Sequence, residues 1–340
     1  MANGRNAALD AADSRVRHHL HVASSPDDAF PEIDGSSPDI RSLKRHMLRV
    51  ARDADITVLI LGESGTGKER VARAIHRASP RCRAPFIVVN CAGLTPTLVE
   101  DELFGHVRGA FTGAVDNRPG PFERASGGTV LLDEVGDLTP DLQMKLLRAI
   151  QQRTVQRLGG THETSFDVRV VAATNVDLAA ATARGRFRED LYYRLKVYEV
   201  PVPPLRRRGA ADVQALAAAI LTRFAERRRR PPPTLEREVL DRLVRYNWPG
   251  NVRELENTLE CMIDAAGTEP TLTMRHLPET FGSTALPSAR RRLPSAAEMV
   301  AALERNAATV GRTAADLGLS RHQLYRLMKR HGIRSPDAER

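Results

Sequence analysis

The stretch GESGTGK, residues 62–68, decides the fold. Gly62, Gly67 and Lys68 fit the phosphate-loop pattern G-x-x-x-x-G-K-[ST], and Glu69 stands where the pattern has Ser or Thr. The β-branched run ITVLILG leads into the loop, and KERVARAIHRA follows it with helical spacing. In this order, backbone N–H groups and a helix N-terminus face phosphate oxygens, and the lysine reaches the β- and γ-phosphates. A plain glycine turn is the alternative, which the flanking strand and helix disfavour.

A second motif, TVLLDE at residues 129–134, completes a nucleotide-hydrolysing site. Its four apolar or β-branched residues predict a buried strand, and two carboxylates follow at the end of that strand. We expect Asp133 to hold a magnesium ion, directly or through water, and Glu134 to polarise the attacking water. A lone LLDE can simply end a strand, but its position after a phosphate loop favours catalysis. The chain contains no N-K-x-D sequence for guanine, which favours ATP.

The pattern of elements predicts an α/β domain followed by helical units. Buried runs alternate with helical segments from residue 56 to residue 202, as in a parallel sheet covered on both faces. We predict six regions in chain order. They are a flexible N-terminal segment (1–35), an α/β ATPase subdomain (36–207), a helical lid (208–282), a linker (283–295), a compact helical unit (296–334) and a tail (335–340).

The composition favours acidic partners and a reducing compartment. The chain has 340 residues, a formal net charge of +9 and a pI of about 10.0. Such a basic balance favours nucleic acid as a partner, although solubility alone explains it equally well. The three cysteines show no metal-ligand spacing. We see no signal peptide and no apolar run of membrane-spanning length, so we expect a cytoplasmic protein with no membrane partner.

Six motifs in a fixed order resemble those of the bacterial enhancer-binding proteins, the AAA+ activators of sigma-54 RNA polymerase. They are GESGTGKE, ELFGHVRGAFTGA, GGTVLLDE, AATN, RFREDLYYRL and NWPGNVRELEN. The resemblance covers roughly residues 36–334, and the family's own phosphate loop carries the Glu seen at position 69. It implies an α/β AAA+ parallel-sheet P-loop ATPase, a helical lid subdomain and a C-terminal all-α helix-turn-helix. It also implies ATP and Mg²⁺ as cofactors.

The resemblance implies roles for residues around the nucleotide. Asn90 is similar to the family's switch asparagine, which holds Glu134 in one nucleotide state and releases it in another. Thr174 and Asn175 match the first sensor, and Arg253 matches the second sensor on the lid. The implied nucleotide-binding set is Gly62, Glu63, Ser64, Gly65, Thr66, Gly67, Lys68, Glu69, Asp133, Thr174, Asn175 and Arg253.

Two arginines of RFREDLYYRL, Arg188 and Arg194, match the family's arginine fingers. In the family these act on the site of a neighbouring subunit, which implies a homo-oligomeric ring, normally a hexamer. Arg184 and Arg186 match no finger position, and we interpret them as solvated surface charges.

The segment GAFTGA resembles the family's loop that touches sigma-54. Its glycines allow the tip to rise and fold back, Phe111 offers an apolar contact and Thr112 a polar one. A structural loop with a buried Phe111 is the alternative. Val107 stands where the family usually has an acidic residue. The expected sigma-54 contacts are Gly109, Ala110, Phe111, Thr112, Gly113 and Ala114.

The helical unit at 296–334 resembles the Fis-type helix-turn-helix domain of the same activators. Its basic helix SRHQLYRLMKR predicts DNA binding. A helical hairpin for oligomerisation is the alternative, and the arginine run at 290–292 favours DNA. The expected DNA-binding residues are Ser320, Arg321, His322, Gln323, Tyr325, Arg326 and Lys329.

Together these features predict an ATP-hydrolysing transcriptional activator. We expect it to bind double-stranded DNA upstream of a promoter and to remodel the sigma-54 RNA polymerase holoenzyme from closed to open complex. The alternative is an AAA+ protein-remodelling ATPase without promoter function, which needs neither GAFTGA nor a helix-turn-helix. Because the ATPase region begins near residue 36, we expect regulation through expression level or a separate regulatory protein.

Overall fold

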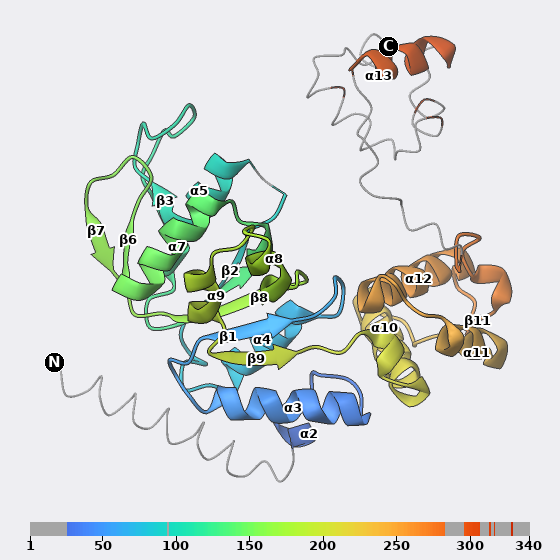
Figure 1. Cartoon of the computed structure of the whole chain (residues 1–340). Coiled ribbons are helices and arrows are strands. Elements are labelled where there is room, and N and C mark those ends of the chain that lie inside the picture. The colour runs from blue at the N-terminus through green and yellow to red at the C-terminus, as the bar shows by residue number, and fades with distance from the viewer. Residues whose placement is uncertain are drawn as a thin grey trace. The chain divides into compact units, whose positions relative to one another are not determined.

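The computed structural model describes residues 26–93, 95–282 and 296–306, together with Thr313, Asp316 and Met328. The chain divides into two compact units, Met1–Phe281 and Gly282–Arg340. The first unit holds the α/β ATPase subdomain and the lid (Figure 1). None of the helices in the described ranges is long and apolar enough to cross a bilayer.

A five-stranded sheet organises the ATPase subdomain, and all of its neighbouring strands run parallel. Its strand order is β2 (Phe86–Asn90), β5 (Thr129–Asp133), β8 (Arg169–Thr174), β1 (Val58–Leu61) and β9 (Tyr198–Pro201). This confirms the predicted parallel α/β fold. Since all five strands share one direction, their carboxyl ends meet at one edge, where ligands of such sheets bind.

Alternating side chains of the strands form two separate cores, one on each face of the sheet. Leu59 of β1 packs into one cluster, whereas Val58 and Ile60 pack into the other. On the first face lie α5 (Pro96–Phe104), α6 (Pro121–Arg124), α7 (Pro140–Gln152), α8 (Leu178–Ala183) and α9 (Glu189–Leu195). On the second lie α2 (Pro26–Ala29), α3 (Pro38–Ala51) and α4 (Lys68–Arg77).

The folded region begins before residue 36, the start predicted for the ATPase subdomain. Residues 26–35 include α2, and Phe30 and Ile33 are buried in the second core. Lys44 of α3 is itself buried and donates to Asp27 (2.7 Å) and to the carbonyl of Gly35 (3.3 Å). Two apolar side chains in a polar stretch are too weak a periodic signal to predict this packing.

The lid is a small helical bundle with its own core. It consists of α10 (Ala210–Arg228), α11 (Arg237–Arg245) and α12 (Asn251–Ala266), with the short pair β10 (Thr234–Leu235) and β11 (Thr271–Leu272). Trp248 is fully buried in that core and donates its indole N–H to the carbonyl of Leu243 (2.8 Å). The indole therefore packs without leaving its one donor unsatisfied.

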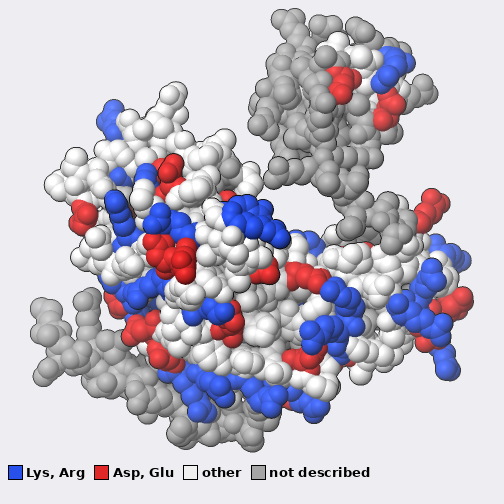
Figure 2. Space-filling view, viewed as in Figure 1, with Lys and Arg blue, Asp and Glu red and all other residues white. Residues whose placement is uncertain are grey.

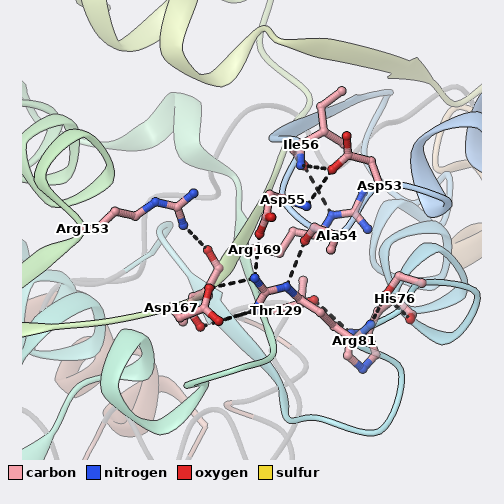
Figure 3. A network of polar contacts seen from close by, with 12 residues as sticks. Asp53, Ala54, Asp55, Ile56, His76, Arg81, Thr129, Arg153, Asp167 and Arg169 are labelled. Atoms are coloured by element: carbon pink, nitrogen blue, oxygen red, sulfur yellow. Dashed lines mark hydrogen bonds and ion pairs between the residues drawn. The ribbon is translucent and has the colours of Figure 1, made fainter. Parts of the chain in front are cut away.

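Polar contacts bind the amino edge of the sheet, opposite the phosphate loop, to the chain around it (Figure 3). Arg169 begins β8, is fully buried and donates to the carbonyls of Val50 and Ile56. Arg81 pairs with both Asp55 (2.6 Å) and Asp167 (2.7 Å). These bonds fix the ends of the strands far from the nucleotide site.

A buried histidine belongs to the same edge. The ring of His76 hydrogen-bonds the hydroxyl of Thr129 (2.9 Å). Burial is the main cause that lowers the pKa of His76 to about 4. The imidazole is therefore neutral at physiological pH and serves as a packed polar core residue.

Two short antiparallel ribbons project from the ATPase subdomain. One joins β3 (Gly105–His106) to β4 (Arg118–Pro119), and the other joins β6 (Thr154–Gln156) to β7 (Glu163–Ser165). Val107 donates its N–H to the carbonyl of Leu158, and Leu158 donates to Gly105. The two ribbons are therefore hydrogen-bonded to each other at their bases.

The second unit is described only in part. Helix α13 (Ala296–Arg305) begins at the start predicted for the C-terminal helical unit. Arg305 and Asn306 both bond the carboxylate of Asp316 (3.2 Å each). All seven predicted DNA-binding residues lie outside the described residues, as do the linker at 283–295, the tail at 335–340 and residues 1–25 of the predicted N-terminal segment.

Candidate nucleotide site and output loop

The phosphate loop has the backbone geometry that its glycines predict. It leaves β1 after Leu61 and enters α4 at Lys68. Gly65 and Gly67 have φ values of 76° and 96°, a left-handed region that favours glycine. The ammonium of Lys68 is buried and donates to the carbonyl of Gly62 (3.1 Å). The lysine therefore folds back over the loop that a phosphate would occupy.

The two carboxylates lie directly beside this lysine. Asp133 ends β5 and Glu134 follows with a left-handed φ of 56°. One carboxylate oxygen of Glu134 accepts from the ammonium of Lys68 (3.0 Å). The other accepts from the backbone N–H of Asn175 (3.0 Å). Three predicted site segments, distant in sequence, thus meet at the carboxyl edge of the sheet.

Asp133 has the character expected of a magnesium ligand. Burial, followed by the charge of Glu134, raises the pKa of its carboxyl group above the usual value. A cation next to the group would reverse that shift, since an opposite charge favours the ionised form. A half-buried carboxylate beside a phosphate loop is the oxygen ligand that Mg²⁺ uses together with nucleotide phosphates. The residues present therefore fit the ion.

The predicted switch and sensor residues lie at the same edge. Asn90 is the register partner of Asp133 on the neighbouring strand, and its side-chain oxygen accepts from the N–H of Ala92 (2.9 Å). Thr174 is fully buried at the end of β8, and its hydroxyl accepts from Val176 (3.0 Å). The carboxylate of Glu134 is thus held by Lys68 rather than by Asn90.

The predicted arginine fingers lie on the surface at α9. Arg188 precedes the helix and pairs with Asp190 through two nitrogens (3.1 and 2.7 Å). Arg194 is exposed and donates to the carbonyl of Ile150 (3.4 Å). Within the described ranges, neither arginine contacts Lys68 or Glu134 of its own chain.

The lid touches the phosphate loop through the backbone of its helix α12. The N–H groups of Val252 and Arg253 both donate to the carbonyl of Gly65 (2.9 and 3.2 Å). A Cβ atom on Gly65 would lie 2.3 Å from the carbonyl oxygen of Gly250, so only glycine fits this contact. The guanidinium of Arg253 also reaches the hydroxyl of Ser64 (3.3 Å). The predicted second sensor therefore lies against the loop.

A carboxylate clamp, made by Glu63, Arg206 and Asn251, was not predicted. Arg206 donates two hydrogen bonds to the carboxylate of Glu63 (2.8 and 2.5 Å). These bonds are the main cause that lowers the pKa of Glu63 to about 2. The amide of Asn251 donates to Glu63 (3.1 Å) and to the carbonyl of Ser64 (3.0 Å), while its oxygen accepts from Leu205 (2.9 Å). The clamp thus joins the loop, the lid and the segment between them.

Among the three clamp residues, we expect replacement of Asn251 to lower the free energy of unfolding most. The residue is fully buried with a left-handed φ of 53°. We expect Asn251→Gly, which keeps that backbone conformation, to destabilise the protein by about 1–3 kcal/mol through unsatisfied groups. It should also weaken ATP binding, because the amide holds the loop. Chemical denaturation and ATP titration measure both effects.

Glu63→Gln is the matched comparison for this prediction. Both members of the Glu63–Arg206 pair are more than 40 % exposed, so we expect this change to cost less than Asn251→Gly. Equal stability and equal ATP affinity in Asn251→Gly and the wild type would show that the clamp does not position the loop.

The GAFTGA segment forms the tip of the β3–β4 ribbon. The N–H of Gly109 donates to the carbonyl of Ala114 (2.8 Å) and closes the tip. Gly109 and Gly113 have φ values of 83° and 106°, which explains both glycines. The Phe111 ring is partly buried and packs edge-on against His106 (centroids 5.1 Å apart), whereas Thr112 is exposed.

The base of this loop is anchored by charge. Asp101 of α5 is buried and accepts from His106 (2.5 Å) and from Arg118 (2.9 Å). Arg157 of the second ribbon pairs with Glu123 (2.6 Å). These contacts fix the base of the β3–β4 ribbon, whereas no side chain of the tip at residues 109–114 is bonded to α5 in the described part of the chain.

Comparison with known proteins decides the family. A family model described as the sigma-54 interaction domain matches residues 33–201, and one described as an AAA+ ATPase lid domain matches residues 206–293. The transcriptional regulatory protein ZraR of Klebsiella oxytoca is 44 % identical over 329 residues, which are 93 % of this chain and 74 % of that protein. The chain belongs to the sigma-54-dependent transcriptional activators.

Other relatives agree with this assignment. The nitrogen fixation protein AnfA of Azotobacter vinelandii is 41 % identical, over 98 % of this chain and 63 % of that protein. The crystal structure of NtrX from Brucella abortus in complex with ATP matches with a TM-score of 0.68 and 34 % identity, covering 88 % of this chain and 69 % of that one. This sigma-54-dependent activator is therefore an ATPase of the AAA+ fold that works on sigma-54, and the reading as a general remodelling ATPase is disfavoured.

Proposed function

We propose that this activator hydrolyses ATP at subunit boundaries of a cytoplasmic ring and uses the GAFTGA tip to open the sigma-54 RNA polymerase complex. The observation that carries the proposal is the Lys68–Glu134 ion pair (3.0 Å), because it marks the junction of the phosphate loop and the general base. Glu134 directly precedes the short helix at Val135–Asp137, which lies against the sheet end. ATP is thus hydrolysed at the carboxyl edge of the sheet, where these residues are held in place.

The site residues divide the chemical work. Mg²⁺, held by Asp133 and nucleotide phosphates, would supply charge neutralisation at the β- and γ-phosphates. Lys68 binds the same phosphates once ATP draws it away from Glu134. Glu134 is then free to orient the attacking water. In another nucleotide state, Asn90 at the end of the adjacent strand would hold the carboxylate of Glu134.

The GAFTGA tip carries the result to sigma-54. Phe111 is folded against His106 in this conformation, whereas Thr112 already faces solvent. A ligand shifts a conformational equilibrium only by its different affinity for the two states. We infer that the ATP state favours a raised tip with Phe111 released, because only this change exposes a new apolar contact for sigma-54.

The C-terminal unit supplies DNA binding in this proposal. The basic helix that begins at Ser320 enters the major groove, and pairing of two units selects half-sites about 34 Å apart or a multiple of that distance. We expect Arg321→Ala or Arg326→Ala to weaken binding to the specific site by about 1–3 kcal/mol if the side chain contacts a base. Footprinting across a genome identifies the site, and titration of that site measures the loss. Unchanged site preference in a chain lacking residues 296–334 would move specific binding elsewhere.

A further inference from the structure

Helix α3 carries a row of arginines on the face opposite its core contacts. Its buried side chains include Ile40, Leu43, Met47 and Val50. Three of its arginines are exposed, and so is the arginine that directly follows its last residue: we call Arg41, Arg45, Arg49 and Arg52 the α3 arginine face. Figure 2 shows Lys and Arg side chains gathered along this edge of the molecule, where Figure 1 places α3.

The spacing of these arginines puts them on one side of the helix. They stand at i, i+4, i+8 and i+11, and at 100° per residue all four lie within an arc of about 80°. The row is about 16 Å long at 1.5 Å per residue. It therefore presents four guanidinium groups in one direction along almost the whole helix.

None of the four guanidinium groups has an ion pair or hydrogen bond with another residue that the structure describes. This contrasts with Arg70, Arg73 and Arg77 of the neighbouring helix α4, each of which pairs with a carboxylate. Like charges at i and i+4 destabilise a helix by about 0.2–0.5 kcal/mol per pair. The α3 arginine face thus carries an unrelieved repulsion that a polyanion would remove.

We propose that the α3 arginine face binds the phosphate backbone of duplex DNA, independently of the C-terminal unit. A duplex carries one negative charge per roughly 1.7 Å of axis, so the length of the row faces several phosphates. The planar fork of Arg matches phosphate oxygens, and contacts to phosphates carry no sequence information. The binding is therefore independent of sequence. The proposal goes beyond the proposed function, since it requires neither sigma-54 nor ATP.

The test compares two variants of the full chain, each losing four positive charges. One carries Arg41→Gln, Arg45→Gln, Arg49→Gln and Arg52→Gln. The control carries Arg229→Gln, Arg237→Gln, Arg242→Gln and Arg245→Gln, which removes four exposed lid arginines that also have no described partner. Fluorescence anisotropy with a random-sequence 30-base-pair duplex gives the affinity over a range of KCl concentrations. ATP hydrolysis is measured alongside and should match the wild type in both variants.

We expect the α3 variant to bind the duplex more weakly, with the slope of log K against log [KCl] shallower by about 3–4, or about 0.9 per phosphate contact. The lid variant should keep the wild-type slope. Equal slopes in the two variants would overturn the proposal. Polyglutamate serves as a second probe. If the α3 variant lost affinity for polyglutamate but bound the duplex as the wild type does, the proposal would also be overturned, and the face would be assigned to an acidic protein surface. Neither result bears on promoter opening, so the proposed function stands or falls separately.

Discussion

Glu134→Gln is expected to stop ATP turnover while ATP still binds. Removing a general base costs about 10²–10⁴ in rate. The structure adds a specific expectation for binding, because the carboxylate of Glu134 holds the ammonium of Lys68 at 3.0 Å. Without that charge, Lys68 is free for phosphate, so ATP affinity should equal or exceed that of the wild type. Equilibrium binding of ATP and steady-state phosphate release measure the two quantities.

Lys68→Ala is the matched control for this prediction. It should abolish both ATP binding and turnover, since the buried ammonium is the only described lysine against the loop. If Glu134→Gln hydrolysed ATP within tenfold of the wild-type rate, another group would have to be the base.

Arg194→Ala is expected to reduce the rate of hydrolysis by about 10³–10⁵, the range typical of an arginine finger. Arg194 lies on an exposed turn of α9, and among the described residues its guanidinium bonds only the carbonyl of Ile150, which leaves it available to a neighbouring subunit. Mixing Lys68→Ala subunits with Arg194→Ala subunits, each inactive alone, should restore partial ATPase activity. Some mixed interfaces then join an intact Lys68 to an intact Arg194.

The control for the mixing experiment is Arg186→Ala, which removes an arginine of the same segment that matches no finger position. It should retain activity alone, and its mixture with Lys68→Ala subunits should show no activity beyond what the Arg186→Ala subunits contribute. No recovery under conditions where mixed rings form would mean that the finger acts within its own chain.

The sequence was most informative for site residues that directly follow a recognisable buried strand. Gly62, Lys68, Asp133 and Thr174 follow buried runs of β-branched and aliphatic residues, and parallel strands bring such ends to one edge. Periodicity and the glycine pattern predicted this meeting for Gly62, Lys68 and Asp133, whereas the family resemblance supplied Thr174. The family resemblance added the lid contact of Arg253, which lies against Ser64.

The parts that escaped prediction depend on tertiary contacts. Glu63 is 143 residues from Arg206 and 188 from Asn251, and no local pattern connects them. The strands of the two projecting ribbons are two or three residues long, too short to produce an alternating pattern. Phe30 packs into the core from a polar segment that holds too few apolar residues to produce a periodic pattern. The ion pair between Glu134 and Lys68 joins residues 66 positions apart, and no local pattern in the sequence predicts it.

The central claim is that hydrolysis at the sheet edge drives promoter opening through the GAFTGA tip. The direct measurement is ATP hydrolysis and open-complex formation by sigma-54 RNA polymerase, recorded in the same reaction for the wild type, Phe111→Ala and Thr112→Ala. No group from Gly109 to Ala114 can act as acid, base or metal ligand, and the tip is built outside the nucleotide site. We therefore predict near-normal hydrolysis and ring assembly in both variants, with sigma-54 contact and promoter opening lost. Collapse of hydrolysis with sigma-54 contact retained would contradict the claim and make the loop structural.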